Sequence, residues 1–277
     1  MKRIDLHVHS NISDGTLSPE EVAHLAHASG LSAIALTDHD TFDGVQACKN
    51  AAAPLGIEVI AGVELSARYE GREIHILGLN IDITDEHFRK VLDDLKVQRE
   101  KRNTYMLKKL NALGFALTFD DLLAHTGEDE IITRAHFARA LFEKGYIKNR
   151  NDAFTKYIGD GQPAYVPKEC LDAKQCIALI HQAGGKAVLA HPMLYKYTKA
   201  EITVLIETLK AEGLDGVEVI YPKHSPEEMS FLRQLCRKEN LILTGGSDFH
   251  GSNKPDIALG KGYGDTLVPY RILEDLF

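Results

Sequence analysis

The fold is decided by residues 4–30, which read IDLHVHSNISDGTLSPEEVAHLAHASG. The apolar run Ile4–Val8 is typical of a buried strand. Ser18 opens a Ser-Pro-Glu-Glu sequence, whose cap, proline and later glutamate together mark a helix N-terminus. Apolar residues then recur at helical spacing until Gly30, which is suited to end the helix. The stretch therefore predicts a strand, a turn and a helix.

The same unit returns along the chain, and a second Ser-Pro-Glu-Glu sequence begins at Ser225. Seven runs read as buried strands: Ile4–Val8, Ala33–Thr37, Ile57–Val63, Ile74–Leu79, Ala187–Ala190, Gly216–Ile220 and Leu241–Thr244. Most of them alternate with helical patterns, which favours an α/β fold with a mainly parallel sheet. Such a series suits a closed barrel or an open doubly wound sheet, and the pattern does not separate the two.

Residues 81–164 interrupt this rhythm. Residues 85–112 read as one long charged helix, shorter helical patterns follow, and no strand pattern is found there. We expect residues 1–80 and 165–277 to form the strand-rich domain, and residues 81–164 to be a helical insert that forms a lid over the active site. The charged run from Arg99 to Arg102 is interpreted as a solvated helix face.

The composition is that of an ordinary globular protein, with 44% hydrophobic and 26% charged residues in 277. A net charge of −8 argues against a broad basic surface for nucleic acid. No signal peptide or membrane-spanning run is evident, and the four cysteines form no C-x-x-C pair. These features predict a cytoplasmic protein with reduced thiols, no membrane association and no obligate protein partner.

Metal-ligating residue types gather at the predicted strand ends. They are His7, His9, Asp14, His39, Glu64, His75, His191, Asp248 and His250. The carboxyl ends of strands form the rim where barrels and doubly wound sheets place their active sites. One histidine at a strand end is commonly structural, but nine ligands at the rims of several strands point to a metal centre.

His7 and His9 are two residues apart on a strand, so their imidazoles face the same side and can bind one ion. One ion rarely takes more than six protein ligands, so nine imply two or three ions that share a bridging carboxylate. Imidazole and carboxylate without thiolate favour manganese, iron or zinc. We expect two or three divalent ions, with manganese the first choice.

With these residues in view, the chain resembles the PHP (polymerase and histidinol phosphatase) family. Residues 5–10 look like its first motif, residues 37–40 its second, residues 191–192 its third and residues 247–250 its fourth. The resemblance covers essentially the whole chain. It implies a distorted (β/α)7 TIM-like barrel, the PHP fold, with a helical insertion and three metal ions.

The resemblance also implies how the ligands divide. His7, His9, Glu64 and Asp248 would hold one ion. Glu64 would bridge to a second ion, held also by His75 and His191. Asp14, His39 and His250 would hold the third. Every one of these positions carries a residue able to bind metal.

A narrower resemblance is to members that act on nucleotide phosphates. The segment Ile132–Ala138 looks like theirs, although Ala135 stands where proline is usual. It implies that Arg134 and His136 bind substrate. Arg134 can hold a phosphate through two parallel N–H donors, and its alternative is a surface salt bridge. His224 follows the sixth strand, so it is a candidate to contact phosphate or protonate the leaving oxygen, the alternative being a residue that only leads into a helix.

These features predict a phosphoric ester hydrolase in which a metal-bridging hydroxide attacks phosphorus, with Asp248 and His224 as the catalytic residues. The leading hypothesis is removal of the 3′-phosphate from a nucleoside 3′,5′-bisphosphate. The alternatives are a 5′→3′ exoribonuclease on short 5′-phosphorylated RNA, a histidinol phosphate phosphatase and a non-catalytic, metal-binding regulatory module. The predicted partner is thus a small phosphate ester or nucleotide, or short RNA.

Overall fold

The predicted strands all form. They are β1 (Arg3–Val8), β2 (Ala33–Leu36), β3 (Glu58–Tyr69), β4 (Arg72–Leu79), β6 (Lys186–Leu189), β7 (Gly216–Ile220) and β8 (Ile242–Gly245). Two strands of two residues each, β5 (Leu171–Asp172) and β9 (Val268–Pro269), are too short to show a sequence pattern. The computed structural model describes residues 2–124, 132–167 and 169–277. No helix in those ranges is long and apolar enough to cross a bilayer.

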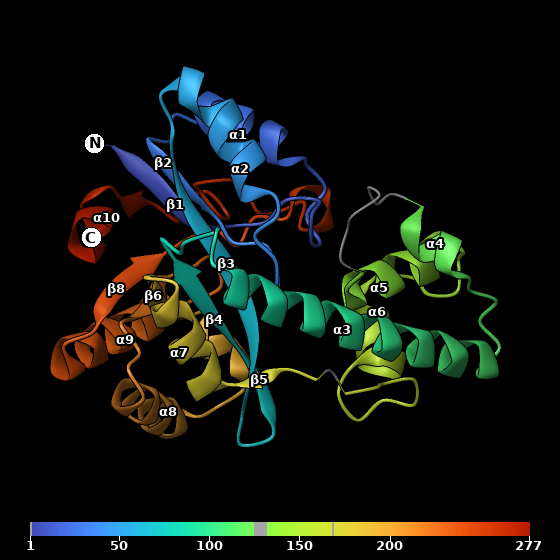
Figure 1. The fold of residues 1–277 in the computed structure, drawn as a ribbon. Helices are drawn as coiled ribbons and strands as arrows, with labels where there is room; N and C mark the ends of the chain where they lie inside the picture. The colour runs from blue at the N-terminus through green and yellow to red at the C-terminus, as the bar shows by residue number, and fades with distance from the viewer. Residues whose placement is uncertain (1, 125–131, 168) are drawn as a thin grey trace.

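The strands form one sheet in the order β8-β7-β6-β4-β3-β2-β1-β9, and β5 pairs with β3 (Figure 1). β1, β2 and β3 are parallel, as are β6, β7 and β8. The sheet curls until Val8 bridges to Phe249, just after β8, and Asp248 donates its N–H to the His7 carbonyl. The result is a nearly closed barrel, which confirms the distorted TIM-like fold over the open sheet.

β3 and β4 form a hairpin that breaks the parallel order. Glu70 and Gly71 make the turn with φ values of 46° and 80°, the left-handed conformation that tight hairpins use. β3 therefore continues to Tyr69, and the expectation that Glu64 follows the third strand is wrong, because Glu64 lies inside it. β4 is antiparallel to both β3 and β6, which leaves His75, near its start, opposite Ser66.

Helices cover the outside of the barrel. They are α1 (Pro19–Ala28), α2 (Val45–Ala52), α7 (Ala173–Gln182), α8 (Lys199–Ala211), α9 (Pro226–Glu239) and α10 (Arg271–Leu276). Short 3₁₀ turns lie at η1 (Ala53–Leu55), η3 (Pro192–Tyr195) and η4 (Gly251–Asn253). Ser18 and Ser225 begin α1 and α9 with capping boxes, as their sequences predict. Gly30, just past α1, has a φ of 69°, which suits glycine at a helix end.

The described part of the segment between β4 and β5 contains helices joined by turns, and no strand. It contains α3 (Glu86–Ala112), α4 (Phe119–Leu123), α5 (Arg134–Glu143), α6 (Asn151–Ala153) and the π-turn η2 (Phe154–Ile158). The first half of α3 packs Phe88 on the barrel core. Its second half packs Met106 into a separate core with α5 and η2, which lies beside the barrel in Figure 1. α3 thus belongs to two hydrophobic cores.

Candidate metal centre

Glu64 lies at the centre of the cluster and is 1% exposed. Its Oε1 atom is 2.8 Å from His75 Nδ1 and 3.0 Å from His191 Nε2. Its Oε2 atom is 3.2 Å from the Nε2 atoms of both His7 and His9. The two oxygens of one carboxylate thus face two different pairs of imidazoles, which is the arrangement of a bridging ligand.

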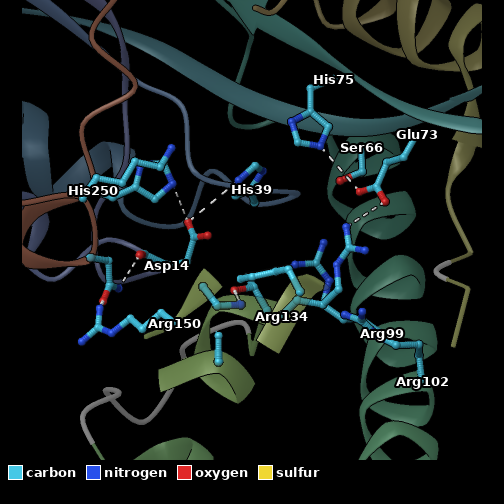
Figure 2. A pocket seen from close by; sticks show the side chains of 16 residues that line it. Asp14, His39, Ser66, Glu73, His75, Arg99, Arg102, Arg134, Arg150 and His250 are labelled. Atoms are coloured by element: carbon cyan, nitrogen blue, oxygen red, sulfur yellow. Dashed lines mark hydrogen bonds and ion pairs between the residues drawn. The ribbon is translucent and has the colours of Figure 1, made fainter. Parts of the chain in front are cut away.

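Asp14 lies at the centre of a second group of imidazoles, beside the first. Its Oδ1 atom is 3.1 Å from His250 Nε2 and 3.9 Å from His39 Nε2 (Figure 2). His39 also lies 3.1 Å from Glu64 through Nδ1, so its ring stands between the two carboxylates. The ligand-type atoms of His9, Asp14, His39 and His250 all lie within 4.8 Å of one another, a spacing that one ion could span.

Asp248 uses its two oxygens differently. Oδ1 is 3.6 Å from His7 Nε2 and 3.5 Å from His9 Nε2. Oδ2 accepts hydrogen bonds from the Tyr221 hydroxyl at 2.8 Å and from Lys254 Nζ at 2.6 Å. Oδ1 is therefore aimed into the cluster while Oδ2 is fixed from behind.

Several ligands hold strained backbone conformations. Asp248 has a φ of 55° and His191 a φ of 27°, values uncommon for residues other than glycine. Gly246, two residues before Asp248, cannot carry a side chain, because a Cβ there would lie 2.4 Å from the Cβ of His7. Gly246 thus lets the loop after β8 lie directly against β1. Such strain persists where surrounding contacts fix the geometry, commonly at functional sites.

Two buried carboxylates fix the strand ends that carry the ligands. Glu218, on β7, accepts from His7 Nδ1 at 3.0 Å and from the His191 backbone N–H at 2.9 Å. The Glu218 carboxylate favours the His7 tautomer with the proton on Nδ1, in which the lone pair of Nε2 points into the cluster. Asp5 accepts from the N–H groups of Ser247 and Gly260 and from the Ser247 hydroxyl, which ties β1 to the chain beyond β8.

Buried polar atoms without partners indicate, independently of any resemblance, that the residues of the cluster can bind divalent ions. Glu64 Oε2 and His39 Nδ1 lie 3.1 Å apart, and both are buried without a hydrogen-bond partner in the described structure. Buried polar atoms are almost always hydrogen-bonded, so such a convergent group needs an explanation. Lone pairs aimed at a shared point are what a bound cation satisfies. The cluster is therefore suited to hold metal.

Electrostatics favour the metal-binding protonation states of two central groups. Burial opposes charge on Glu64, but His39, His7 and His75 outweigh it and hold its pKa well below the usual value. Burial, and then the nearby His250, lower the pKa of His9 to about 4. At neutral pH Glu64 is ionised and His9 is neutral, the forms in which each binds metal.

A pocket of about 320 Å³ opens beside the cluster, at the lower end of the range for ligand sites. Its barrel wall includes Asp14, His39 and His75, and the opposite wall comes from the helical segment (Figure 2). Arg99 and Arg102 of α3 line it and are only 4% and 6% exposed. The interpretation of this run as a solvated face is wrong for these two residues. They lie one turn apart, on the helix face turned to the pocket.

Five cations line the pocket in all: Arg99, Arg102, Arg134, Arg150 and Lys254. Arg99 pairs with Asp40, and Arg134 donates to Glu73 at 3.2 Å. Arg150 donates to the amide oxygen of Asn253 at 2.8 Å. The pocket thus combines a metal-type cluster with a cationic wall, which suits an anionic substrate.

Two predicted substrate residues lie elsewhere. His224 does not line the pocket: it packs on Tyr221, bonds the Val219 carbonyl through Nδ1 and is 5% exposed. His136 is 3% exposed and also lies outside the pocket lining. Its Nδ1 accepts from the backbone N–H of Thr133, completing the capping box of α5. Burial lowers the pKa of His136 to about 4, so this ring is neutral at neutral pH.

Sequence reasoning missed several residues that shape the site. Glu218, Tyr221 and Lys254 support ligands, yet each stands in a segment without a metal-type motif. The sequence of β7 does contain a signal for Glu218. This residue interrupts the apolar run Gly216–Ile220, and a buried charge in a strand requires a partner. No comparable local signal marked Arg99 and Arg102, which lie in a run of charges.

A PHP domain model matches residues 5–160. The chain is 41% identical over 249 residues to a 5′-3′ exoribonuclease of Haemophilus influenzae, with 90% of each covered. It is 37% identical over 271 residues to a 3′,5′-nucleoside bisphosphate phosphatase of Chromobacterium violaceum, covering 97% of this chain and 94% of that protein. A solved Bifidobacterium adolescentis protein, described as a metal-dependent phosphoesterase, superposes with a TM-score of 0.89 at 31% identity, covering 99% and 95%.

The matches to the two relatives and to the solved structure span 90–99% of the chain and agree with the geometry of the site. The family model covers the strands and loops that carry His7, His9, Asp14, His39, Glu64 and His75. The barrel, the convergent His, Asp and Glu ligands and the adjoining cationic pocket are together suited to phosphate-ester hydrolysis. The chain belongs to the PHP domain family and is a phosphoesterase.

Proposed function

We propose that the chain removes the 3′-phosphate from a nucleoside 3′,5′-bisphosphate. The observation that carries this proposal is that two anion-binding features line the same pocket, the metal-type cluster on one wall and arginines on the other. A substrate with two phosphates can engage both. A relative that is 37% identical is a 3′,5′-nucleoside bisphosphate phosphatase, which supports the same substrate.

The nine predicted ligands are proposed to hold up to three divalent ions, with manganese the first choice. The two oxygens of Glu64 face separate imidazole pairs, which supports a bridge between two ions. Asp14, His39 and His250 would hold the third. Such ions supply Lewis-acid stabilisation of charge that develops on the phosphoryl oxygens. The catalytic role proposed for Asp248 is to hold metal through Oδ1.

The protein's own groups would orient the substrate. Arg134, a proposed phosphate ligand, faces the pocket from the first turn of α5, where helix N–H groups also favour an anion. Ala135, Ala138 and Phe154 give the same wall an apolar part that fits a sugar or base. The helical segment 81–164 would act as the lid. His224, which packs behind Tyr221, and His136, which caps α5, are better suited to positioning than to contact with substrate.

The experiment is product analysis of manganese-loaded protein given adenosine 3′,5′-bisphosphate. Release of one phosphate to leave AMP would support the proposal. Metal binding without turnover would contradict it and favour the second candidate, a 5′→3′ exoribonuclease, which the 41% identity to such an enzyme supports. A 5′-phosphorylated RNA of three to five nucleotides would then be the next substrate. The cytoplasmic location stays a prediction that cell fractionation would test.

A further inference from the structure

The five pocket-lining cations differ in how they are compensated. Arg99 is paired with Asp40, Arg134 with Glu73 and Lys254 with Asp248. Arg150 has a neutral partner, the Asn253 side chain. Arg102 has neither a hydrogen bond nor an ion pair within the described ranges, and its buried Nε atom is without a partner there. Arg102 is therefore a cation in the wall of the pocket without a paired side chain in the described ranges, and it feels Glu73, the partner of Arg134, only at longer range.

A guanidinium without a paired side chain is costly when it is 94% buried, as the 6% exposure of Arg102 implies. Removing a charge from water costs several kcal/mol unless an opposite charge or hydrogen bonds replace the solvent. Burial, and then the nearby Arg134, lower the pKa of Arg102 only to about 10, so the side chain stays charged at neutral pH. A charge retained at this cost points to an anion that binds it.

The position of Arg102 indicates which part of a substrate this anion is. Arg99 pairs with Asp40, the residue after the predicted ligand His39, so it marks the metal side of the wall. Arg102 is three residues further along α3, about 4.5 Å along the helix axis. There its charge interacts with Arg134, Glu73 and Tyr165, none of which is a predicted metal ligand. The geometry therefore separates an anion at Arg102 from one bound at the cluster.

We propose that Arg102, with Arg134, forms a subsite for a second phosphate, the one that is not hydrolysed, and that Arg102 makes the enzyme select substrates with two phosphates. This inference rests on the proposed function. It assigns Arg102 as the residue that binds the 5′-phosphate. A guanidinium suits this role because its fork of N–H donors can bind two phosphate oxygens at once. Glu73 is paired with Arg134 and also attracts Arg102, so one carboxylate faces two guanidinium groups and one positive charge stays unbalanced.

The test compares two substrates that differ only in the second phosphate, adenosine 3′,5′-bisphosphate and adenosine 3′-phosphate. Arg102→Met keeps the apolar stem and removes the charge. It should lower kcat/KM about 10- to 100-fold for the bisphosphate, the usual loss for a charged hydrogen bond, and leave the monophosphate nearly unchanged. Arg102→Lys should restore part of the loss. Lys101→Met, which removes an exposed charge from the same helix, is the matched control and should change neither rate.

Equal losses on the two substrates, or no loss on the bisphosphate, would overturn the proposal. Thermal unfolding gives an independent readout. Removing an unpaired buried charge should leave the Tm unchanged or raise it, because burial of that charge opposes folding. A lower Tm for Arg102→Met than for Lys101→Met would assign Arg102 a structural role and also overturn the proposal.

Failure of the proposed function itself gives a different result. The wild-type protein would then hydrolyse p-nitrophenyl phosphate but not the bisphosphate. Inhibition of p-nitrophenyl phosphate hydrolysis by the bisphosphate would still decide the role of Arg102. A 10-fold or greater weakening of this inhibition in Arg102→Met would support the second-phosphate subsite. Equal inhibition of the variant and the wild type would overturn it.

Discussion

At the scale of single residues, Glu218 connects two parts of the metal centre without facing the pocket. It accepts from the His7 imidazole and from the His191 backbone. Glu218→Gln would place an amide N–H₂ against one of these two donors and remove the negative charge. Loss of such a supporting carboxylate typically lowers metal affinity 10- to 100-fold. We expect this loss for manganese, measured by calorimetric titration of the metal-free protein.

The control for Glu218→Gln is Glu212→Gln. Glu212 pairs with Lys174 at the protein surface, and such exposed pairs contribute little. Its manganese affinity should equal that of the wild type. An unchanged affinity in Glu218→Gln itself, with the circular dichroism spectrum preserved, would show that the tautomer of His7 is fixed without Glu218.

Residues of the centre differ in how far the sequence could predict them. His7 and His9 could be found because alternation on a strand and a position at its end are local properties. Glu218 and Arg102 could not be assigned roles in this way. Their roles depend on which strand and which helix face meet the cluster, and packing between distant segments decides that. Arg134 was predicted through resemblance, and only the structure reveals its pairing with Glu73.

At the scale of elements, the start of α8 depends on a capping box that is far from the pocket. The Thr198 hydroxyl accepts from the backbone N–H of Glu201, and the Glu201 carboxylate accepts from the backbone N–H of Thr198. Thr198→Ala removes this cap and should lower the free energy of unfolding by about 0.5–2 kcal/mol, measured by urea denaturation. Thr208→Ala, at an exposed position within the same helix, should change it by less than about 0.5 kcal/mol. Equal effects of the two would contradict the capping role.

The helical segment has its own core, which lets its packing be tested separately. Phe137 is fully buried there, among Met106, Leu141 and Ile158. Phe137→Ala should lose about 3–5 kcal/mol of local stability because of the cavity it leaves. If the segment acts as a lid, the variant should lose hydrolysis of the bisphosphate and keep manganese binding, measured by titration. Loss of both properties together would show that the barrel depends on the same core.

The β3–β4 hairpin shows why some elements escape prediction. The apolar runs locate both strands, since burial sets those locally, but β3 continues six residues beyond the run Ile57–Val63. Their antiparallel pairing depends on the turn at Glu70–Gly71, which lacks the Asn-Gly or Asp-Gly signature of such hairpins. Capping boxes, in contrast, are complete within four residues, so α1 and α9 begin where their sequences predict.

At the scale of the whole molecule, the barrel and the metal centre should stabilise one another. A metal that binds only the folded state adds about 2.7 kcal/mol at a free concentration 100 times its dissociation constant. For a chain of 277 residues this corresponds to a rise in Tm of roughly 5 °C. We expect chelation to lower the Tm by this amount and manganese to restore it, measured by scanning calorimetry. A Tm independent of manganese would contradict the proposed site.

One helix joins the two cores, and this has a consequence for how the enzyme works. α3 contains neither glycine nor proline over its 27 residues, and sharp helix kinks occur almost always at such residues or at π-bulges. On the side of α3, the helical wall of the pocket is therefore connected to the barrel by a continuous, stiff helix rather than by a hinge. We expect the mouth of the pocket to keep its width on this side and turnover to avoid the microsecond-to-millisecond gating step that hinged lids impose. Its rate should then depend little on solvent viscosity.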